Sequence, residues 1–263
     1  MGTSMLTAYQ KQKKSIGHFP LEIVEKNKNK LKILKKKFAK NKFFNELPNK
    51  WQGNVIVIAV KPQSFKKVAL DIITKKVKSE CVVSIMAGVS VETLKKQIVF
   101  SCDIIRAMPN KGSEVLLGAT CIYSKGKITN YKKNIVNKLF KPLGKTYWIK
   151  DEALMDPVTA IAGSGPAYFF LFILNLIEIA KELGFTNNLA KELVFNTALG
   201  SIHIALKNKN LTKLINDVKS PGGTTEAALE ILEKKKSSNL YNILKKAVSS
   251  ANTKAIQISK SIN

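Results

Sequence analysis

The feature that most constrains the fold is an unbroken run of apolar, mostly β-branched residues at positions 55–60. A strand that is apolar on both faces is typical of a parallel sheet covered on both sides. Lys61-Pro62 ends this run, and apolar residues then recur at helical spacing over residues 65–73. This alternation predicts an α/β fold with a parallel sheet and with ligands at the carboxyl ends of its strands. The later strands are expected at 81–85, 102–107, 116–123 and 145–149, and the later helices at 91–97 and 130–140.

After residue 150 the sequence changes character, since no strand-like run follows and long helical periods take over. The last helix, over residues 240–258, has apolar residues at steps of three and four. Helix 189–206 carries Ala198, Ser201 and Ala205 on one face, and these small residues allow another helix to come close. We therefore predict two domains, residues 1–150 and 151–263, of which the second is all-helical and assembles at least into a homodimer.

The net charge of +26 would ordinarily favour a nucleic-acid partner. However, Arg106 is the only arginine among 44 basic residues. Proteins that clamp phosphates or read bases depend on the planar guanidinium group. Lysines scattered among Asn and Ile indicate instead the codon bias of an AT-rich genome. We therefore predict no nucleic-acid partner, and a non-enzymatic basic binding protein is favoured by the charge alone.

Cysteine and histidine offer no pattern of a metal or redox centre. Cys81, Cys102 and Cys121 match no known ligand spacing, so we expect reduced, buried cysteines, as in a cytoplasmic protein. His18 and His203 have no partner pattern and are expected to be structural or exposed.

The most apolar run, residues 166–180, bears on membrane association. It contains Asn175 and Glu178 and is shorter than the roughly 20 residues that a membrane span needs. We interpret it as a buried core helix, and we predict a cytoplasmic protein without a signal peptide or a membrane partner.

A dinucleotide-binding domain begins with a strand and a Gly-x-Gly-x-x-Gly turn, whereas this sequence opens with Met1-Gly2-Thr3-Ser4 and a helix over 3–14. A strand at 21–24 then ends at Glu25, at about the 20-residue distance that separates the glycine turn from the acidic residue on the ribose. Gly2 therefore corresponds to the last glycine of the turn. We expect the domain to be truncated at its first strand, through a late start codon or a shortened gene. Such a chain should bind cofactor poorly, and an upstream extension should improve binding and melting temperature.

A second glycine-containing stretch, Ser220-Pro221-Gly222-Gly223-Thr224-Thr225-Glu226, precedes an apolar helical run. Paired glycines let the chain turn with its amides exposed, and the hydroxyls lie at the start of the next helix. Such a group of N–H and O–H donors suits a carboxylate or a phosphate. The alternative interpretation is a plain Pro-Gly-Gly turn with a Thr N-cap.

Four motifs in order resemble pyrroline-5-carboxylate reductases, and the resemblance runs over nearly the whole chain. They are Ala59-Val60-Lys61-Pro62-Gln63, Arg106-Ala107-Met108-Pro109-Asn110, the segment from Asp156 to Tyr168, and Ser220 to Thr225. The resemblance implies reduction of the cyclic imine 1-pyrroline-5-carboxylate to L-proline by NADPH or NADH, the last step of proline biosynthesis. It also implies a Rossmann-like dinucleotide-binding domain followed by a helical domain that interlocks in dimers, which often assemble into rings.

The resemblance also implies roles for individual residues. The substrate carboxylate would be held by Ser220, Gly222, Gly223 and Thr224, and the hydroxyl of Thr225, the candidate catalytic residue, would face the ring nitrogen. No strong general base is needed, because a protonated imine is already electrophilic and needs mainly to be held against the nicotinamide. The cofactor would be contacted by Gly2, Thr3, Glu25, Lys26, Ala59, Val60, Lys61, Pro62, Met86, Ala87 and Gly88.

The choice of cofactor is left open by the residues themselves. Glu25 favours a free ribose 2′-hydroxyl and hence NADH, whereas Lys26 and Lys28 suit the 2′-phosphate of NADPH. The resemblance to the family favours NADPH.

Three departures and alternatives accompany this interpretation. Lys111-Gly112 stands where the family usually has Thr-Pro, so the contacts of that loop are in doubt, and Arg106 is a candidate for orienting it. A related β-hydroxy-acid dehydrogenase would need a catalytic lysine in the first long helix, and residues 166–180 contain none. A truncated, inactive paralogue is the remaining alternative.

Overall fold

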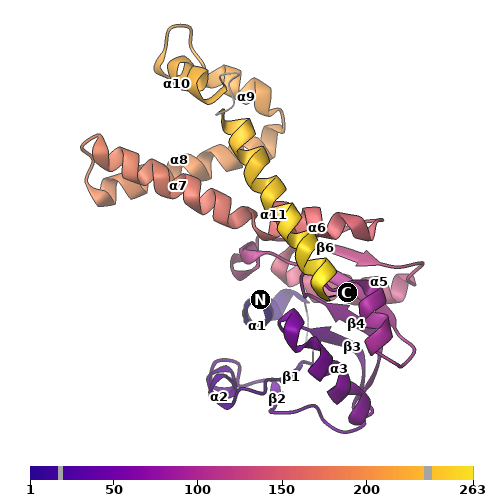
Figure 1. Cartoon of the computed structure of the whole chain (residues 1–263). Coiled ribbons are helices and arrows are strands. Elements are labelled where there is room, and N and C mark those ends of the chain that lie inside the picture. The colour runs from indigo at the N-terminus through magenta and orange to yellow at the C-terminus, as the bar shows by residue number, and fades with distance from the viewer. Residues whose placement is uncertain (17–19, 234–238, 263) are drawn as a thin grey trace. The chain divides into compact units, whose positions relative to one another are not determined.

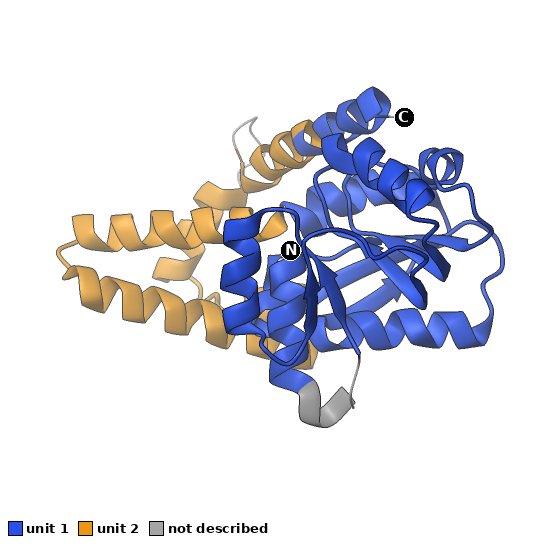
Figure 2. Ribbon diagram, turned by 90° about the horizontal axis from the view of Figure 1, so that it is seen from below, with its two compact units in different colours: residues 1–164, 251–263 blue, residues 165–250 orange. Residues whose placement is uncertain are grey.

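The structure is a computed structural model that describes residues 1–16, 20–233 and 239–262. It divides into two compact units: unit 1 comprises residues 1–164 and 251–263, and unit 2 comprises residues 165–250 (Figure 2). The division falls after the predicted boundary between residues 150 and 151, because Met155 is buried in the core of unit 1. His18, which was expected to be structural or exposed, lies outside the described residues.

Unit 1 is built on a five-stranded sheet with the order β3-β4-β5-β6-β7. The predicted parallel pairing holds for three neighbouring pairs, whereas β5 and β6 are antiparallel, with Arg106 opposite Tyr123. This pair differs because residues 109–117 contain no crossover helix, which a parallel connection requires. The strands are β3 (Gln52–Ile58), β4 (Lys78–Ser84), β5 (Asp103–Met108), β6 (Gly118–Ser124) and β7 (Gly144–Trp148).

A separate two-stranded parallel sheet pairs β1 (Glu22–Val24) with β2 (Lys42–Phe44). Strand β2 was not predicted from the sequence, because it has only three residues. Helix α2 (Lys28–Lys37) connects the two strands and buries Leu31 and Leu34. Within the described residues no strand joins β1 to β3, so the sheet is interrupted where the first strand of a dinucleotide-binding domain is expected.

Helices cover both faces of the five-stranded sheet (Figure 1). Successive residues of a strand point to opposite faces, and β4 shows this directly. Cys81 packs with Phe140 in one apolar cluster, while its neighbour Val82 packs with Phe65 in the other. The strand is therefore buried on both faces, as its composition predicts. The covering helices are α1 (Gly2–Ile16) and α5 (Asn130–Phe140) on one face, and α3 (Phe65–Thr74) and α4 (Val91–Gln97) on the other.

Unit 2 is all-helical, as predicted, and α7 and α8 pack along each other (Figure 1). The prediction of a buried core helix over residues 166–180 is wrong for the single chain, because many large side chains of α7 are exposed, among them Phe169, Phe170 and Phe172. Among the described helices, the continuous stretch Glu152–Glu182 is long and apolar enough to cross a membrane by length and composition, with 17% of its most apolar window buried. The helices are α7 (Gly165–Glu182), α8 (Asn187–Asn208), α9 (Leu211–Val218), α10 (Thr224–Glu233) and the first part of α11 (Leu240–Ile262).

Candidate active site

Three of the predicted cofactor stretches meet at one edge of unit 1. Ala59 follows the carboxyl end of β3, and a Cβ built on Gly2 would lie 3.5 Å from the Cβ of Ala59, so the start of α1 lies beside that strand end. The amide of Ile85, just after β4, donates to the carbonyl of Ile58 at 3.1 Å. The structure therefore brings Gly2, the end of β3 and the end of β4 together, at the edge where open α/β sheets bind nucleotides.

The start of α1 suits an anionic group. Its first turn contains no acidic residue, and the free amides of a helix N-terminus attract negative charge. Thr3 is exposed there. Next to it, the hydroxyl of Ser4 donates to Glu114 at 3.0 Å, and Lys111 pairs with the same carboxylate at 2.7 Å. Lys111 thus neutralises the Glu114 carboxylate that contacts this turn.

Gly88 is required by the fold of the loop after β4. Its φ angle is +77°, a conformation that residues with a side chain rarely adopt. A Cβ at this position would also lie 3.1 to 3.2 Å from Ile258 and Ser259 of α11. The loop therefore packs tightly on α11, and Met86 beside it is buried.

Two of the three residues that bear on cofactor choice, Glu25 and Lys26, already have partners. Glu25 accepts from the amide of Asn27 at 3.1 Å and pairs with Lys30 at 2.6 Å. Lys26 pairs with Asp71 of α3 while its side chain stays largely exposed. The negative charge of Glu25 and the positive charge of Lys26 are therefore both balanced locally.

Two backbone amides of the loop before α10 already donate hydrogen bonds to groups in the loop itself or in the first turn of α10. The amide of Gly222 donates to the carboxylate of Glu226 at 2.7 Å, and the amide of Gly223 donates to the carbonyl of Ser220 at 2.9 Å. The pKa of Glu226 is lowered first by this amide hydrogen bond and then by Lys219, whose ammonium lies 3.2 Å away. Gly222 and Gly223 therefore shape the turn, and other groups are left to bind a ligand.

The open donors lie in the first turn of α10. The first amides of a helix have no partner within it, and α10 begins at Thr224. In the part of the chain that the structure describes, the hydroxyls of Ser220, Thr224 and Thr225 have no hydrogen-bond partner. These amides and hydroxyls form a donor group that suits a small carboxylate. The contact between Glu226 and Gly222 was not predicted, although a Glu at the third position of a helix is a known sign of such a capping contact.

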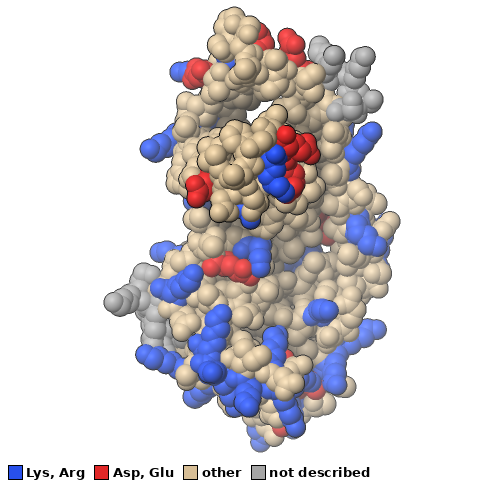
Figure 3. Space-filling model, turned by 90° about the vertical axis from the view of Figure 1, so that its left-hand side faces the viewer, with Lys and Arg blue, Asp and Glu red and all other residues tan. Residues whose placement is uncertain are grey.

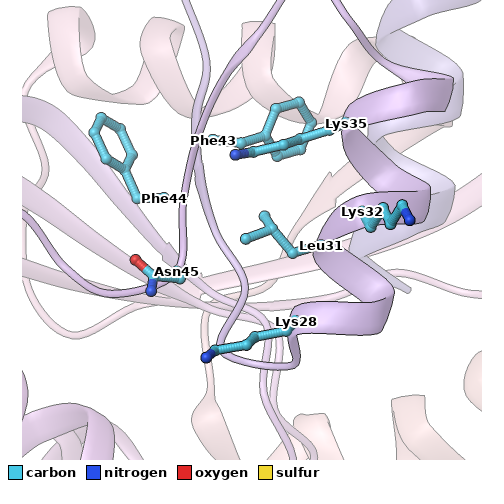
Figure 4. Close-up of a pocket in the computed structure, with 7 residues that line it drawn as sticks. All are labelled: Lys28, Leu31, Lys32, Lys35, Phe43, Phe44 and Asn45. Atoms are coloured by element: carbon cyan, nitrogen blue, oxygen red, sulfur yellow. The ribbon is translucent and has the colours of Figure 1, made fainter.

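A hollow of about 550 Å³ lies between α2 and β2, away from these stretches. Figure 4 shows Lys35 beside Phe43 on one side of it, and Lys28 below Asn45 on the other. Apart from Lys28, no residue proposed above for the cofactor or the substrate lines it. Lysines are also spread over other parts of the surface, as Figure 3 shows for one face, so the positive charge is not confined to this hollow.

The described residues offer few groups for metal binding or redox chemistry. Among the described residues, no cluster of three His, Cys, Asp or Glu side chains is placed to hold a metal ion. Cys81 is buried, Cys102 and Cys121 are half-buried, and all three are free. His203 is exposed on α8.

An α/β unit with a candidate nucleotide site at its strand ends, followed in the chain by a helical unit with a candidate carboxylate-binding turn, is typical of dinucleotide-dependent oxidoreductases. Comparisons with known proteins narrow this class. Residues 152–258 match the family model described as pyrroline-5-carboxylate reductase dimerisation. A pyrroline-5-carboxylate reductase from Pasteurella multocida is 32% identical over 210 residues, which cover 79% of this chain and 75% of the relative. The enzyme of that name from Pisum sativum is 36% identical over 183 residues, covering 69% and 66%.

Solved structures agree with this assignment. The pyrroline-5-carboxylate reductase from Coxiella burnetii superposes with a TM-score of 0.83 at 29% identity, covering 98% of this chain and 94% of that one. The Plasmodium falciparum pyrroline carboxylate reductase with NADP bound gives a TM-score of 0.81 at 27% identity, with the same coverage. This chain belongs to the pyrroline-5-carboxylate reductase family.

Proposed function

We propose that this chain reduces 1-pyrroline-5-carboxylate to L-proline with NADPH, and with NADH as a poorer donor, as the last step of proline biosynthesis. The observation that carries the proposal is the set of open amides and hydroxyls in the first turn of α10, in a chain of this family. Such amides and hydroxyls bind a small carboxylate without the help of a positively charged side chain.

The substrate carboxylate is assigned to the amides of Thr224 and Thr225 and to the hydroxyls of Ser220 and Thr224. Gly222 and Gly223 shape the loop, and the hydroxyl of Thr225 faces the ring nitrogen. When bound, the reduced nicotinamide supplies the hydride. Hydride addition to the carbon of a protonated imine gives the neutral ring amine directly, so the protein needs to bind and orient rather than to move a proton.

The residues at the predicted cofactor edge fit a dinucleotide. The turn at the start of α1 holds the pyrophosphate through Gly2 and Thr3, and Gly88 lets the backbone approach closely. The ribose and nicotinamide are assigned to Ala59, Val60, Lys61 and Pro62 after β3, and to Met86 and Ala87 after β4. NADPH is preferred because Lys30 balances Glu25, which removes the repulsion of a 2′-phosphate, while Lys28 attracts it and Lys26 does so by exchanging its pairing with Asp71 for the phosphate.

The assembly is proposed to be at least a homodimer in the cytoplasm, with a ring of dimers as a further possibility. The chain contains the dimerisation domain of its family. The large apolar side chains exposed on α7 and α8 of the single chain, such as Phe170 and Phe195, suit burial against a second copy.

The proposal is tested by following NADPH oxidation spectrophotometrically with the cyclic imine added last. We expect imine-dependent oxidation, a lower rate with NADH, and proline as the product. The same assay on an upstream-extended chain separates a weak enzyme from an inactive paralogue. Cofactor binding without any imine-dependent oxidation in either chain contradicts the proposal.

A further inference from the structure

An ion pair between a buried arginine and a half-buried glutamate lies at the end of the loop that joins β4 to α4. Arg106 Nη1 donates to Glu152 Oε1 at 2.9 Å, and the same oxygen accepts the amide hydrogen of Val91 at 2.8 Å. Arg106 is only 5% exposed. We propose that Arg106 and Glu152 are positioning residues that fix the loop at residues 85–90 for the dinucleotide. This inference rests on the proposed function, because it takes Met86 to Gly88 as cofactor contacts.

The loop is held at its first end by the sheet. The amide of Ile85 donates to the carbonyl of Ile58 at 3.1 Å, and the amide of Met86 donates to the hydroxyl of Ser84 at 3.3 Å. In the middle, Gly88 packs against the backbone of Ser259. The path of the chain between these points and α4 then depends on how its second end is held.

Glu152 holds that second end. Val91 is the first residue of α4, and the first amides of a helix have no acceptor within it. Ser90 caps the helix by accepting from the amide of Thr93 at 3.1 Å, which leaves the Val91 amide to Glu152. A carboxylate at a helix start is also favoured by the helix dipole. The start of α4 is therefore fixed in position by one oxygen of Glu152.

Arg106 keeps that oxygen in place. It lies on β5, and its neighbours in the register of the sheet are Ser84 on β4 and Tyr123 on β6. Within the described residues Glu152 is the acidic side chain paired with Arg106, and the buried Nε of Arg106 has no partner. A buried charge without a counter-charge is costly, so each member of the pair fixes the other.

The use of arginine at this position is itself informative. The chain has lysine at every other basic position, so Arg106 departs from its strong preference for lysine. A guanidinium is planar and weakly hydrated, whereas the lysine ammonium is strongly hydrated and suits burial less. Among the described residues, the Arg106 side chain hydrogen-bonds to Glu152 and not to the loop after β5, where Asn110 Oδ1 accepts from the amide of Ala119 at 3.1 Å. Arg106 was expected to orient that loop, and its hydrogen bond runs to Glu152 instead.

The test uses the conservative variants Arg106→Lys and Glu152→Gln in the full chain. Glu92→Gln is the matched control, because Glu92 lies next to Val91 on α4 and forms an exposed pair with Lys96. NADPH affinity is measured by fluorescence, imine KM by steady-state kinetics, and loop order by hydrogen exchange of residues 85–91 without cofactor. We expect NADPH Kd to rise about tenfold, imine KM to stay within about twofold, and loop exchange to speed up in both variants but not in the control.

The outcomes separate a positioning role from a structural one. Unchanged NADPH affinity and unchanged loop exchange in folded variants overturn the proposal. An equal loss of affinity for both ligands, together with a lowered melting temperature, also overturns it, because a general loosening then explains the data. If the wild-type chain fails to reduce the imine, the proposed function fails, while the exchange of the cofactor-free loop still decides whether Arg106 and Glu152 hold it.

Discussion

Thr225 is the residue on which the proposed chemistry depends most. It occupies the second position of α10, and its hydroxyl has no partner within the described residues. Thr225→Ala is expected to slow turnover at least tenfold, about 1.4 kcal/mol of barrier, because the contact to the ring nitrogen is lost. Thr212→Ala, at the second position of α9, is the matched control for kcat and for melting temperature. Wild-type kcat in Thr225→Ala would remove Thr225 from the mechanism.

Glu226 offers a second test at the same loop. Its lowered pKa keeps it charged at neutral pH. If the substrate carboxylate binds in this turn as proposed, the charge of Glu226 repels it. In Glu226→Gln the amide oxygen still accepts from Gly222, but the charge is gone. We expect the imine KM to fall about two- to fivefold, a small effect because solvent screens exposed charges. Glu230→Gln, one turn further along α10, serves as control, and a raised KM in Glu226→Gln alone contradicts this view.

At the level of residues, the sequence predicted the loop before α10 best, because the residues that shape the backbone there are also the ones that carry the proposed chemistry. The Pro-Gly-Gly-Thr-Thr stretch indicated a turn before a helix, and α10 begins at Thr224 with Glu226 in its first turn. It did not indicate that Glu226 takes the Gly222 amide, because the choice between a side-chain acceptor and a ligand is made by loop geometry. In the same way, no local pattern links Arg106 to Glu152, which lies far along the chain.

At the scale of elements, Tyr9 attaches α1 to the rest of unit 1. The Tyr9 hydroxyl donates to the carbonyl of Leu139 in the core, and burial raises the pKa of Tyr9 above its usual value. Tyr9→Phe leaves that carbonyl without its donor, so we expect a loss of about 1 kcal/mol in the free energy of unfolding at neutral pH. Denaturant unfolding monitored by circular dichroism measures it.

The same residue gives a pH dependence with a definite sign. Since the pKa of Tyr9 is raised in the folded state, its contribution is complete below the ordinary tyrosine pKa of about 10 and is lost as the pH rises further. Cys81 and Cys102, whose pKa values burial raises to about 11, add to the loss at alkaline pH in both proteins. The gap in stability between wild type and Tyr9→Phe should therefore shrink above about pH 10. A constant gap contradicts the role of the hydroxyl.

Element prediction worked where an apolar run made the pattern strong. The runs at 55–60 and 81–85 correspond to β3 and β4, and β4 is buried on both faces. β3 ends at Ile58 and is an edge strand in which Ile58 alone is fully buried, so the expectation that it is buried on both faces is wrong. Pattern alone did not reveal β2, which is too short to show a period. The antiparallel pairing of β5 with β6 was likewise not visible, because direction follows from the short connection between them and not from composition.

At the scale of the whole molecule, the exposed apolar side chains of unit 2 are the proposed dimer contact. Phe169 and Phe172 lie three residues apart on α7 and are 64% and 51% exposed in the single chain. Replacing both by Glu would bury charge in a contact with a second copy, so we expect the dimer to dissociate. Sedimentation velocity measures it, with Ile33→Glu on the exposed face of α2 as control. A wild-type chain that stays monomeric at micromolar concentration contradicts the proposed dimer.

The change in sequence pattern after residue 150 correctly predicted a helical second half. The prediction that α7 is buried was wrong for the single chain. Apolar composition does not distinguish a helix buried within its own chain from one buried against another copy. The boundary between the two units falls after residue 164 and not after residue 150, where the sequence pattern changes. The reason is that Met155 packs in the core of unit 1 before the long helices begin.

The most direct measurement of the central claim is deuterium transfer from NADPH labelled at the nicotinamide C4 position to the cyclic imine. The account predicts proline that carries a single deuterium on the former imine carbon, from one face of the nicotinamide, and a strong decrease of this product in Thr225→Ala. Proline without deuterium, or no proline from a folded chain that binds NADPH, would contradict it.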